Sequence, residues 1–127
     1  MLAGIDVNGN GIRDDVEIYI RVNFGKSEKE VQALNQFARA NQMGLIAKTE
    51  VESMKAGMAM MRSFDCQSYA TPGSQAWKLV EAICLNTAAR IDAWQDHERR
   101  ISGQEFEASN TFDEKASCTF YPDLLKN

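Results

Sequence analysis

Apolar side chains recur at spacings of three and four residues along most of this chain, which is the period of one face of an α-helix. The predicted helices span residues 14–23, 27–47, 50–63 and 75–101. Acidic residues suit the start of the first helix, and Ser27 with Glu30 forms a capping-box pattern at the start of the second. The pattern therefore predicts an all-α fold, a small irregular bundle of three to four helices.

Turn-forming residues mark the places where the predicted helices stop. The Thr-Pro-Gly sequence at 71–73 predicts a chain reversal, because proline disfavours helix in the residue before it and glycine permits positive φ. Asn86 and Thr87 have short polar side chains that compete for backbone donors, so they favour a kink inside the predicted helix at 75–101. Residues 104–127 have weak periodicity, which predicts an extended C-terminal tail packed over the bundle.

Length and composition are typical of a single globular domain covering residues 1–127. The chain has 44% hydrophobic and 25% charged residues, with a formal net charge of −4. Its basic residues are scattered along the chain without an extended cluster, which argues against nucleic-acid binding, because phosphate backbones are bound by clustered cations. No apolar run approaches the roughly 18–20 residues that cross a bilayer, so no transmembrane segment is expected.

The stretch Asp6–Glu17 has the spacing of a twelve-residue calcium-binding loop. Oxygen-bearing side chains occupy loop positions 1, 3, 5, 9 and 12, and Gly11 at position 6 permits the sharp turn. Calcium is a hard cation that prefers about six to eight oxygen ligands, and a short loop supplies them by folding around the ion. The predicted ligands are the side chains of Asp6, Asn8, Asn10, Asp14 and Glu17 and the backbone carbonyl of Ile12.

A bare polar turn is the alternative interpretation of this stretch, since Asp, Asn and Gly are common turn formers and Asp14 suits a helix cap. The joint match of five side-chain positions and one glycine favours calcium. Only Asp6, Asp14 and Glu17 bring formal charge to the ligand set, so we expect an affinity on the order of 10⁻⁵ to 10⁻³ M. A site of that affinity stays mostly empty at resting cytosolic calcium and fills outside the cell.

Residues 6–17 resemble the EF-hand-like loops of secreted bacterial proteins, dockerin-type loops included, and the calcium repeats of thrombospondin type. The resemblance covers 12 of 127 residues and implies Ca²⁺ as the bound ion. The chain departs from a full EF-hand because only five residues precede Asp6 and because Arg13 stands where EF-hands usually have an apolar residue. The order of calcium loop, helical bundle and Cys-containing tail also resembles small uncharacterised exported bacterial proteins.

The three cysteines lack CxxC spacing, so neither a zinc ribbon nor a thioredoxin-type site is indicated. Cys84 lies on an apolar helical face, where we expect a buried, inert thiol. Cys66 and Cys118 lie in segments that we interpret as irregular, so we predict a disulfide between them in an exported protein, with Cys66–Cys84 as the alternative. Three reduced thiols in a cytosolic protein remain the other possibility.

Calcium and the disulfide together favour a periplasmic or secreted protein. We expect its export signal to lie outside residues 1–127, because Met1-Leu2-Ala3-Gly4 lacks the charged and apolar regions of a signal peptide. The sequence therefore predicts a calcium-stabilised extracytoplasmic binding or interaction module. Its partner, a protein or a small ligand, and its oligomeric state are not indicated by the sequence.

A second interpretation is a small-ligand or partner-peptide binding protein with a helical groove rich in methionine and tryptophan. Methionine side chains are flexible and line adaptable grooves, although they can also ligate copper(I) or simply fill a core. The groove residues would be Met54, Met58, Met61, Trp77 and Trp94. Solvent exposure of these side chains separates a groove from a core.

The sequence gives no support for an enzyme. His97 is the only histidine, and its charged neighbours at 96–100 predict an exposed position on a helix. The chain contains no P-loop, GxGxxG, GxSxG or HExxH motif. A small hydrolase is therefore the weakest interpretation, and it would need a pocket that joins His97 to carboxylates of another helix.

Overall fold

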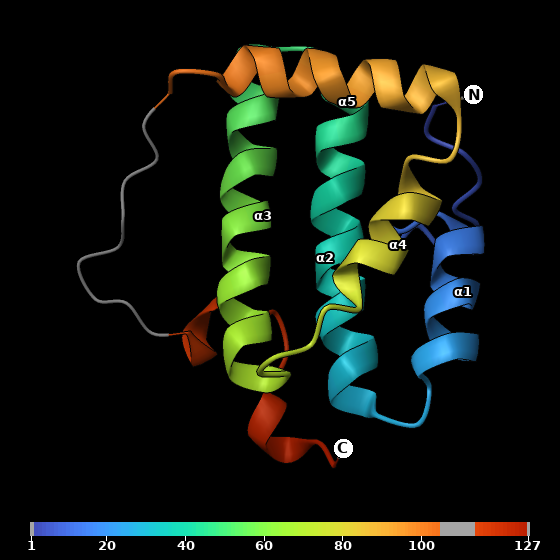
Figure 1. Cartoon of the computed structure of the whole chain (residues 1–127), viewed down its shortest axis with the longest axis vertical. Coiled ribbons are helices and arrows are strands. Elements are labelled where there is room, and N and C mark those ends of the chain that lie inside the picture. The colour runs from blue at the N-terminus through green and yellow to red at the C-terminus, as the bar shows by residue number, and fades with distance from the viewer. Residues whose placement is uncertain (1, 105–113, 127) are drawn as a thin grey trace.

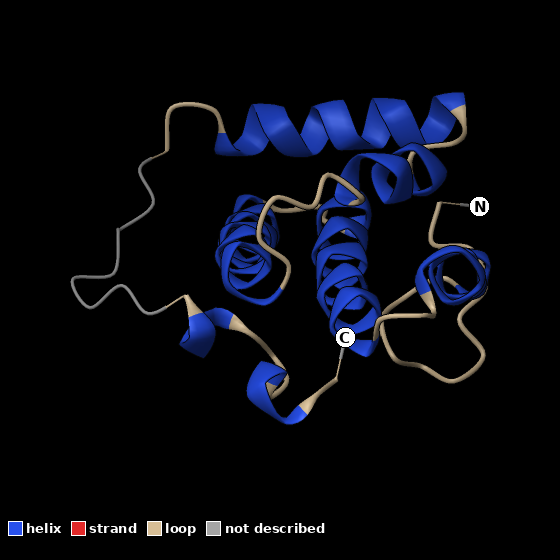
Figure 2. Ribbon diagram, turned by 60° about the horizontal axis from the view of Figure 1, so that its bottom comes forward, coloured by secondary structure: helices blue, strands red, loops and turns tan. Residues whose placement is uncertain are grey.

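The computed structural model of the protein describes residues 2–104 and 114–126. Its helices are α1 (Asp14–Phe24), α2 (Glu28–Ile46), α3 (Glu50–Ala70), α4 (Trp77–Cys84) and α5 (Ala88–Ile101), with short 3₁₀ helices η1 (Lys115–Ser117) and η2 (Pro122–Leu124). Helices α1, α2 and α3 lie side by side with α2 in the middle, α4 packs on α1 and α2, and α5 crosses the ends of α2 and α3 (Figures 1 and 2). The predicted all-α fold is confirmed, with five α-helices in the described residues.

Helix α2 is the centre of the fold and contacts every other α-helix. Phe37 of α2 meets Phe64 of α3 and Trp77 of α4, with ring centroids 5.8 Å apart in both pairs. Phe64 and Trp77 are themselves 5.0 Å apart in an edge-to-face arrangement, and such pairs add about 0.5–1.5 kcal/mol beyond the area they bury. The buried core around these rings consists of Ile12, Val16, Ile20, Val31, Leu34, Phe37, Ala38, Val80 and Cys84.

Three of the helices begin directly after a hydroxyl residue that caps them. The side chains of Ser27, Thr49 and Thr87 each accept a hydrogen bond from the backbone N–H three residues further on, at 3.2, 3.1 and 3.1 Å. Each bond satisfies one of the donors that the first turn of a helix leaves without an internal partner. Local side-chain chemistry therefore sets the starts of α2, α3 and α5.

The predicted end of the third helix was wrong. Helix α3 continues to Ala70 rather than stopping at residue 63, so Cys66 lies in a helix and not in an irregular segment. The buried face of this extension carries Ser63, Cys66 and Gln67. Gln67 Nε2 donates to the Ser63 hydroxyl at 3.1 Å, so these two buried polar side chains are paired with each other. An apolar period does not detect a helical face that is buried with small and polar side chains.

The predicted helix at 75–101 consists of two helices. Helix α4 ends at Cys84, and Thr87 caps the start of α5, so the expected kink at Asn86-Thr87 is a complete break. The break allows α5 to leave the direction of α4 and cross the ends of α2 and α3 (Figure 1).

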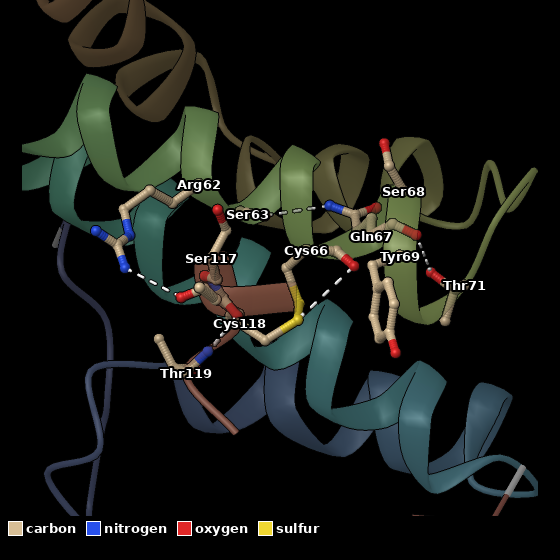
Figure 3. The surroundings of a disulfide bond; sticks show 12 residues. Arg62, Ser63, Cys66, Gln67, Ser68, Tyr69, Thr71, Ser117, Cys118 and Thr119 are labelled. Carbon is tan, nitrogen blue, oxygen red and sulfur yellow. Dashed lines mark hydrogen bonds between the residues drawn. A yellow bond between two sulfur atoms is a disulfide. The ribbon is translucent and has the colours of Figure 1, made fainter. Parts of the chain in front are cut away.

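The described part of the tail packs against α3 and α2. A disulfide with an S–S distance of 2.06 Å joins Cys66 to Cys118, directly after η1 (Figure 3). Gln36 of α2 donates to the Ser117 carbonyl at 2.8 Å and accepts from the Thr119 N–H at 2.9 Å. The predicted Cys66–Cys118 pair is confirmed, and two 3₁₀ turns replace the expected extended chain. Residues 105–113 and 127 of the predicted tail lie outside the described residues.

Cys84 is the cysteine left free, and its thiol is buried in the core as the sequence predicted. Burial raises the pKa of this thiol to about 12. Because the thiolate is the reactive form, a thiol with this pKa is inert at neutral pH.

Candidate metal centre

The loop from Asp6 to Glu17 is folded by a series of tight turns. Gly9 and Gly11 have φ angles of 66° and 83°, left-handed values that favour glycine. Asp6 Oδ2 accepts a hydrogen bond from the Gly11 N–H at 2.9 Å, which closes the first half of the loop on itself. Gly11 therefore makes the turn that loop position 6 requires.

Side chains from separate loop positions converge on Glu17, which lies in the first turn of α1. The Asn10 amide donates to Oε1 and Oε2 of Glu17 at 2.6 and 3.0 Å, and the Asn8 amide donates to the same two oxygens at 3.3 and 3.4 Å. Asp14 accepts from the Val7 N–H at 3.1 Å. The loop thus brings loop positions 3, 5 and 12 together in one hydrogen-bonded cluster.

One carboxylate oxygen of Asp6 is buried without a hydrogen-bond partner among the described residues. This oxygen is Oδ1, whereas Oδ2 binds Gly11. A buried anionic oxygen without a donor or a cation is energetically costly. Loop position 1 therefore has an unused acceptor of the type that a hard cation binds.

The hydrogen bonds within the loop differ from those of a loop wrapped around an ion. Within residues 2–104 and 114–126, no group of three or more His, Cys, Asp and Glu side chains is placed to hold a metal. Asn8 and Asn10 direct amide nitrogens at Glu17, while the Asn10 oxygen accepts from the Ile12 N–H at 3.0 Å. Binding an ion would require these two amides to turn their oxygens inward.

Arg13 anchors the loop to α4, although the sequence only marked it as a departure from the EF-hand pattern. Its side chain is 3% exposed and donates to the carbonyl oxygens of Ile83 and Cys84 at 2.9 and 3.2 Å. Its Nε and Nη2 also bind the two Asp15 carboxylate oxygens at 2.5 and 2.8 Å, and these bonds hold the pKa of Asp15 below its usual value. A guanidinium suits the end of α4, where carbonyl groups lack helical partners.

Two further contacts fix the loop to the bundle. The side chain of Ile12 is 1% exposed and belongs to the core, which holds the backbone at loop position 7. Arg39 of α2 donates from Nε to the Asn10 carbonyl at 2.9 Å. The loop is therefore attached to α2 and to the hydrophobic core, in addition to its contact with α4.

Comparison of this chain with protein-family models, with curated proteins and with solved structures found no match. Across the described residues, no helix combines the length and the apolar character needed to span a bilayer.

The residues of the predicted Met/Trp groove have different surroundings. Met58 and Met61 are exposed on α3, at 55% and 43%, so they do not fill the core. Trp77 packs against Phe37 and Phe64 in the aromatic cluster, whereas Trp94 packs against His97 on α5. Met54 is half-buried. The two tryptophans thus serve two separate packing contacts, and a groove formed by all five residues stays a prediction.

His97 is 2% exposed, so its predicted exposed position was wrong. Its ring packs on Trp94 with centroids 4.8 Å apart. Gly44 of α2 lies against both rings, because a Cβ at Gly44 would come within 2.6 Å of Trp94 and 2.9 Å of His97. His97 Nδ1 has no hydrogen-bond partner in the described part of the chain. The histidine is therefore a packing residue at the crossing of α5 and α2.

Burial, and then the positive charge of Arg100, lower the pKa of His97 from its ordinary value of 6.5. Because the pKa of His97 is lower in the folded state than in the unfolded state, protonation of this ring does not reduce the free energy of unfolding above about pH 6.5. As the pH falls below that value towards the folded-state pKa, the free energy of unfolding declines. The protein has one histidine, so a single imidazole signal in ¹H–¹³C NMR reports it, and we expect its midpoint below 6.5. In urea the midpoint should return to about 6.5, and a folded midpoint at or above that value would contradict the lowered pKa.

Proposed function

We propose that this protein is a calcium-stabilised binding or interaction module that works outside the cytoplasm, in the periplasm or as a secreted protein. The loop Asp6–Glu17 is its structural Ca²⁺ site. The observation that carries the proposal is the convergence of Asn8 and Asn10 on Glu17, together with the unpartnered Oδ1 of Asp6. Both features belong to a loop with calcium-site spacing and with left-handed glycines at positions 4 and 6.

Calcium would act by replacing repulsion among carboxylates with ligation. Asp6, Asp14 and Glu17 would contribute carboxylate oxygens, and Ile12 would contribute its backbone carbonyl. Asn8 and Asn10 would turn their amide oxygens towards the ion. The ion would then fasten the N-terminal segment to the first turn of α1, because the ligands come from both.

Two observations favour a location outside the cytoplasm. Disulfides persist in oxidising compartments and are rare in the cytosol, and Cys66 and Cys118 lie at disulfide distance. A loop with three carboxylates among its ligands has an affinity suited to the calcium levels outside cells.

Calcium should raise the melting temperature of the wild-type protein relative to the protein in a chelator. A metal that binds only the folded form stabilises it by RT ln(1 + [L]/Kd), which is about 1.4 kcal/mol when calcium is tenfold above Kd. The variant Glu17→Gln keeps the hydrogen-bonding shape of the side chain but removes one ligand charge. We expect it to lose most of the calcium-dependent shift in differential scanning calorimetry, and Asp6→Ala with Glu17→Ala to lose all of it.

The matched control is Asp92→Asn, which removes one carboxylate from an exposed position on α5. It should retain the full shift, which excludes a general response of an acidic protein to a divalent ion. Identical melting curves of the wild type in calcium and in chelator would overturn the calcium site.

A further inference from the structure

A cavity of about 550 Å³ is lined by residues from the end of α2, from α5 and from the N-terminal segment. Leu45 and Ile46 from the last turn of α2, Ala93 from α5 and Leu2 from the N-terminal segment supply aliphatic walls. Pockets of this volume with apolar walls and a few polar groups are typical of small-molecule sites. None of the cavity residues is a predicted ligand of the calcium loop.

The walls of this cavity are held in place by hydrogen bonds. The Gln42 side chain of α2 donates to the Ala3 carbonyl at 2.8 Å, and Arg90 of α5 donates to the Leu2 carbonyl at 3.2 Å. Arg100 of α5 donates to the Ala47 carbonyl at 3.0 Å, which joins α5 to the end of α2. The three walls thus have fixed positions without a ligand.

Two cations in the cavity lining, Lys48 and Arg100, have no ion-pair partner among the described residues. The one carboxylate in the lining, Asp96, is bound by Arg99 at 2.7 Å. Arg100 uses one N–H on Ala47, and a guanidinium has five such donors. This local positive charge occurs in a protein whose net charge is −4.

We propose that this cavity binds a single-chain aliphatic carboxylate of medium length. The lining contains no aromatic side chain that could stack on a ring and no hydroxyl or amide side chain that could recognise a sugar or a peptide group. Recognition therefore depends on aliphatic contact and on the charges of Lys48 and Arg100. A carboxylate accepts charge-assisted hydrogen bonds from both cations, while its alkyl chain lies along Leu45 and Ile46.

Titration of the full chain with sodium octanoate in EDTA tests this proposal, with 1-octanol as the uncharged probe of equal chain length. By isothermal titration calorimetry, octanoate should bind about tenfold more tightly than octanol, because its carboxylate accepts charge-assisted hydrogen bonds that are stronger than those of a neutral hydroxyl. Lys48→Gln and Arg100→Gln should each lower the affinity for octanoate and leave the affinity for octanol unchanged. Lys48 is exposed, so its variant tests the charge without removing the hydrogen bond from Arg100 to the Ala47 carbonyl.

The cavity itself is tested by Ala93→Trp, which fills it, against Ala89→Trp, which adds the same side chain one turn earlier at an exposed position. The affinity for octanoate should fall at least tenfold in Ala93→Trp and not in Ala89→Trp. In the wild-type protein, the ¹H–¹⁵N signals that shift on addition of octanoate should be those of Leu45, Ile46, Ala93 and their neighbours. The proposal is overturned by no binding at millimolar octanoate, by equal affinity for octanoate and octanol, or by equal losses in the two tryptophan variants. Because EDTA removes calcium, these outcomes are independent of the calcium loop.

Discussion

Replacing Cys66 and Cys118 together with alanine should lower the free energy of unfolding by about 4 kcal/mol. The disulfide joins residues 52 positions apart, so it removes much of the conformational freedom of the unfolded chain. Its loss would therefore stabilise the unfolded state more than it disturbs the folded one. Urea denaturation followed by circular dichroism measures the effect as a lower midpoint. The tail would also lose its covalent attachment to α3, leaving Gln36 as a tie to Ser117 and Thr119.

The control for this prediction is Cys84→Ala, which removes a sulfur from the core without opening a covalent loop. We expect it to cost about 1 kcal/mol, the range for deleting a small buried group. Thiol titration of the unfolded, unreduced wild type should find one reactive thiol, because two of the three cysteines are paired. Three reactive thiols, or equal losses of stability in the alanine variants, would contradict the disulfide.

Replacing Arg13 with methionine should lower the free energy of unfolding by about 2–4 kcal/mol. Methionine has a similar length and fills the space, but it leaves the Ile83 and Cys84 carbonyl oxygens without their donors. An unsatisfied buried acceptor costs about 1–3 kcal/mol. Asp15 contributes less to the loss, because its side chain is 55% exposed and water can solvate it.

The matched control is Arg21→Met on α1, where the arginine and its partner Glu28 are both exposed, at 55% and 38%. An exposed ion pair contributes about 0–1 kcal/mol, so this variant should unfold close to the wild type. Arg13→Lys should fall between the wild type and Arg13→Met, because lysine keeps the charge but lacks the planar fork that reaches several acceptors. Equal urea midpoints for Arg13→Met and Arg21→Met would show that Arg13 does not anchor the loop.

The contacts of Arg13 show what this side chain does at a loop position where EF-hands usually have an apolar residue. The residue at loop position 8 reaches the C-terminal carbonyls of α4, so an element of the same domain supports the loop. An arginine suits this place because it has several donors and remains charged when buried. The predicted calcium site would thus work as a single loop fixed to its own bundle.

Much of the architecture was predictable because it follows from short-range chemistry. Ser27 and Thr87 mark helix starts by side-chain hydrogen bonds to residues three positions away. The predictions failed where burial does not follow hydrophobicity, as at the buried residues Ser63 and Gln67, which are joined by a hydrogen bond within α3. They failed again at His97, where charged neighbours indicated an exposed face but the ring lies against Trp94 and Gly44.

The amino-acid sequence by itself determined the helical class, the capped helix starts and the glycine turns of the Asp6–Glu17 loop, because these depend on groups a few residues apart. Only the tertiary structure decided that Cys118 rather than Cys84 pairs with Cys66, that Arg13 holds α4, and that His97 packs on α2. Each of these contacts joins residues at least 52 positions apart. Which distant groups meet depends on how the helices pack, and no local pattern contains that information.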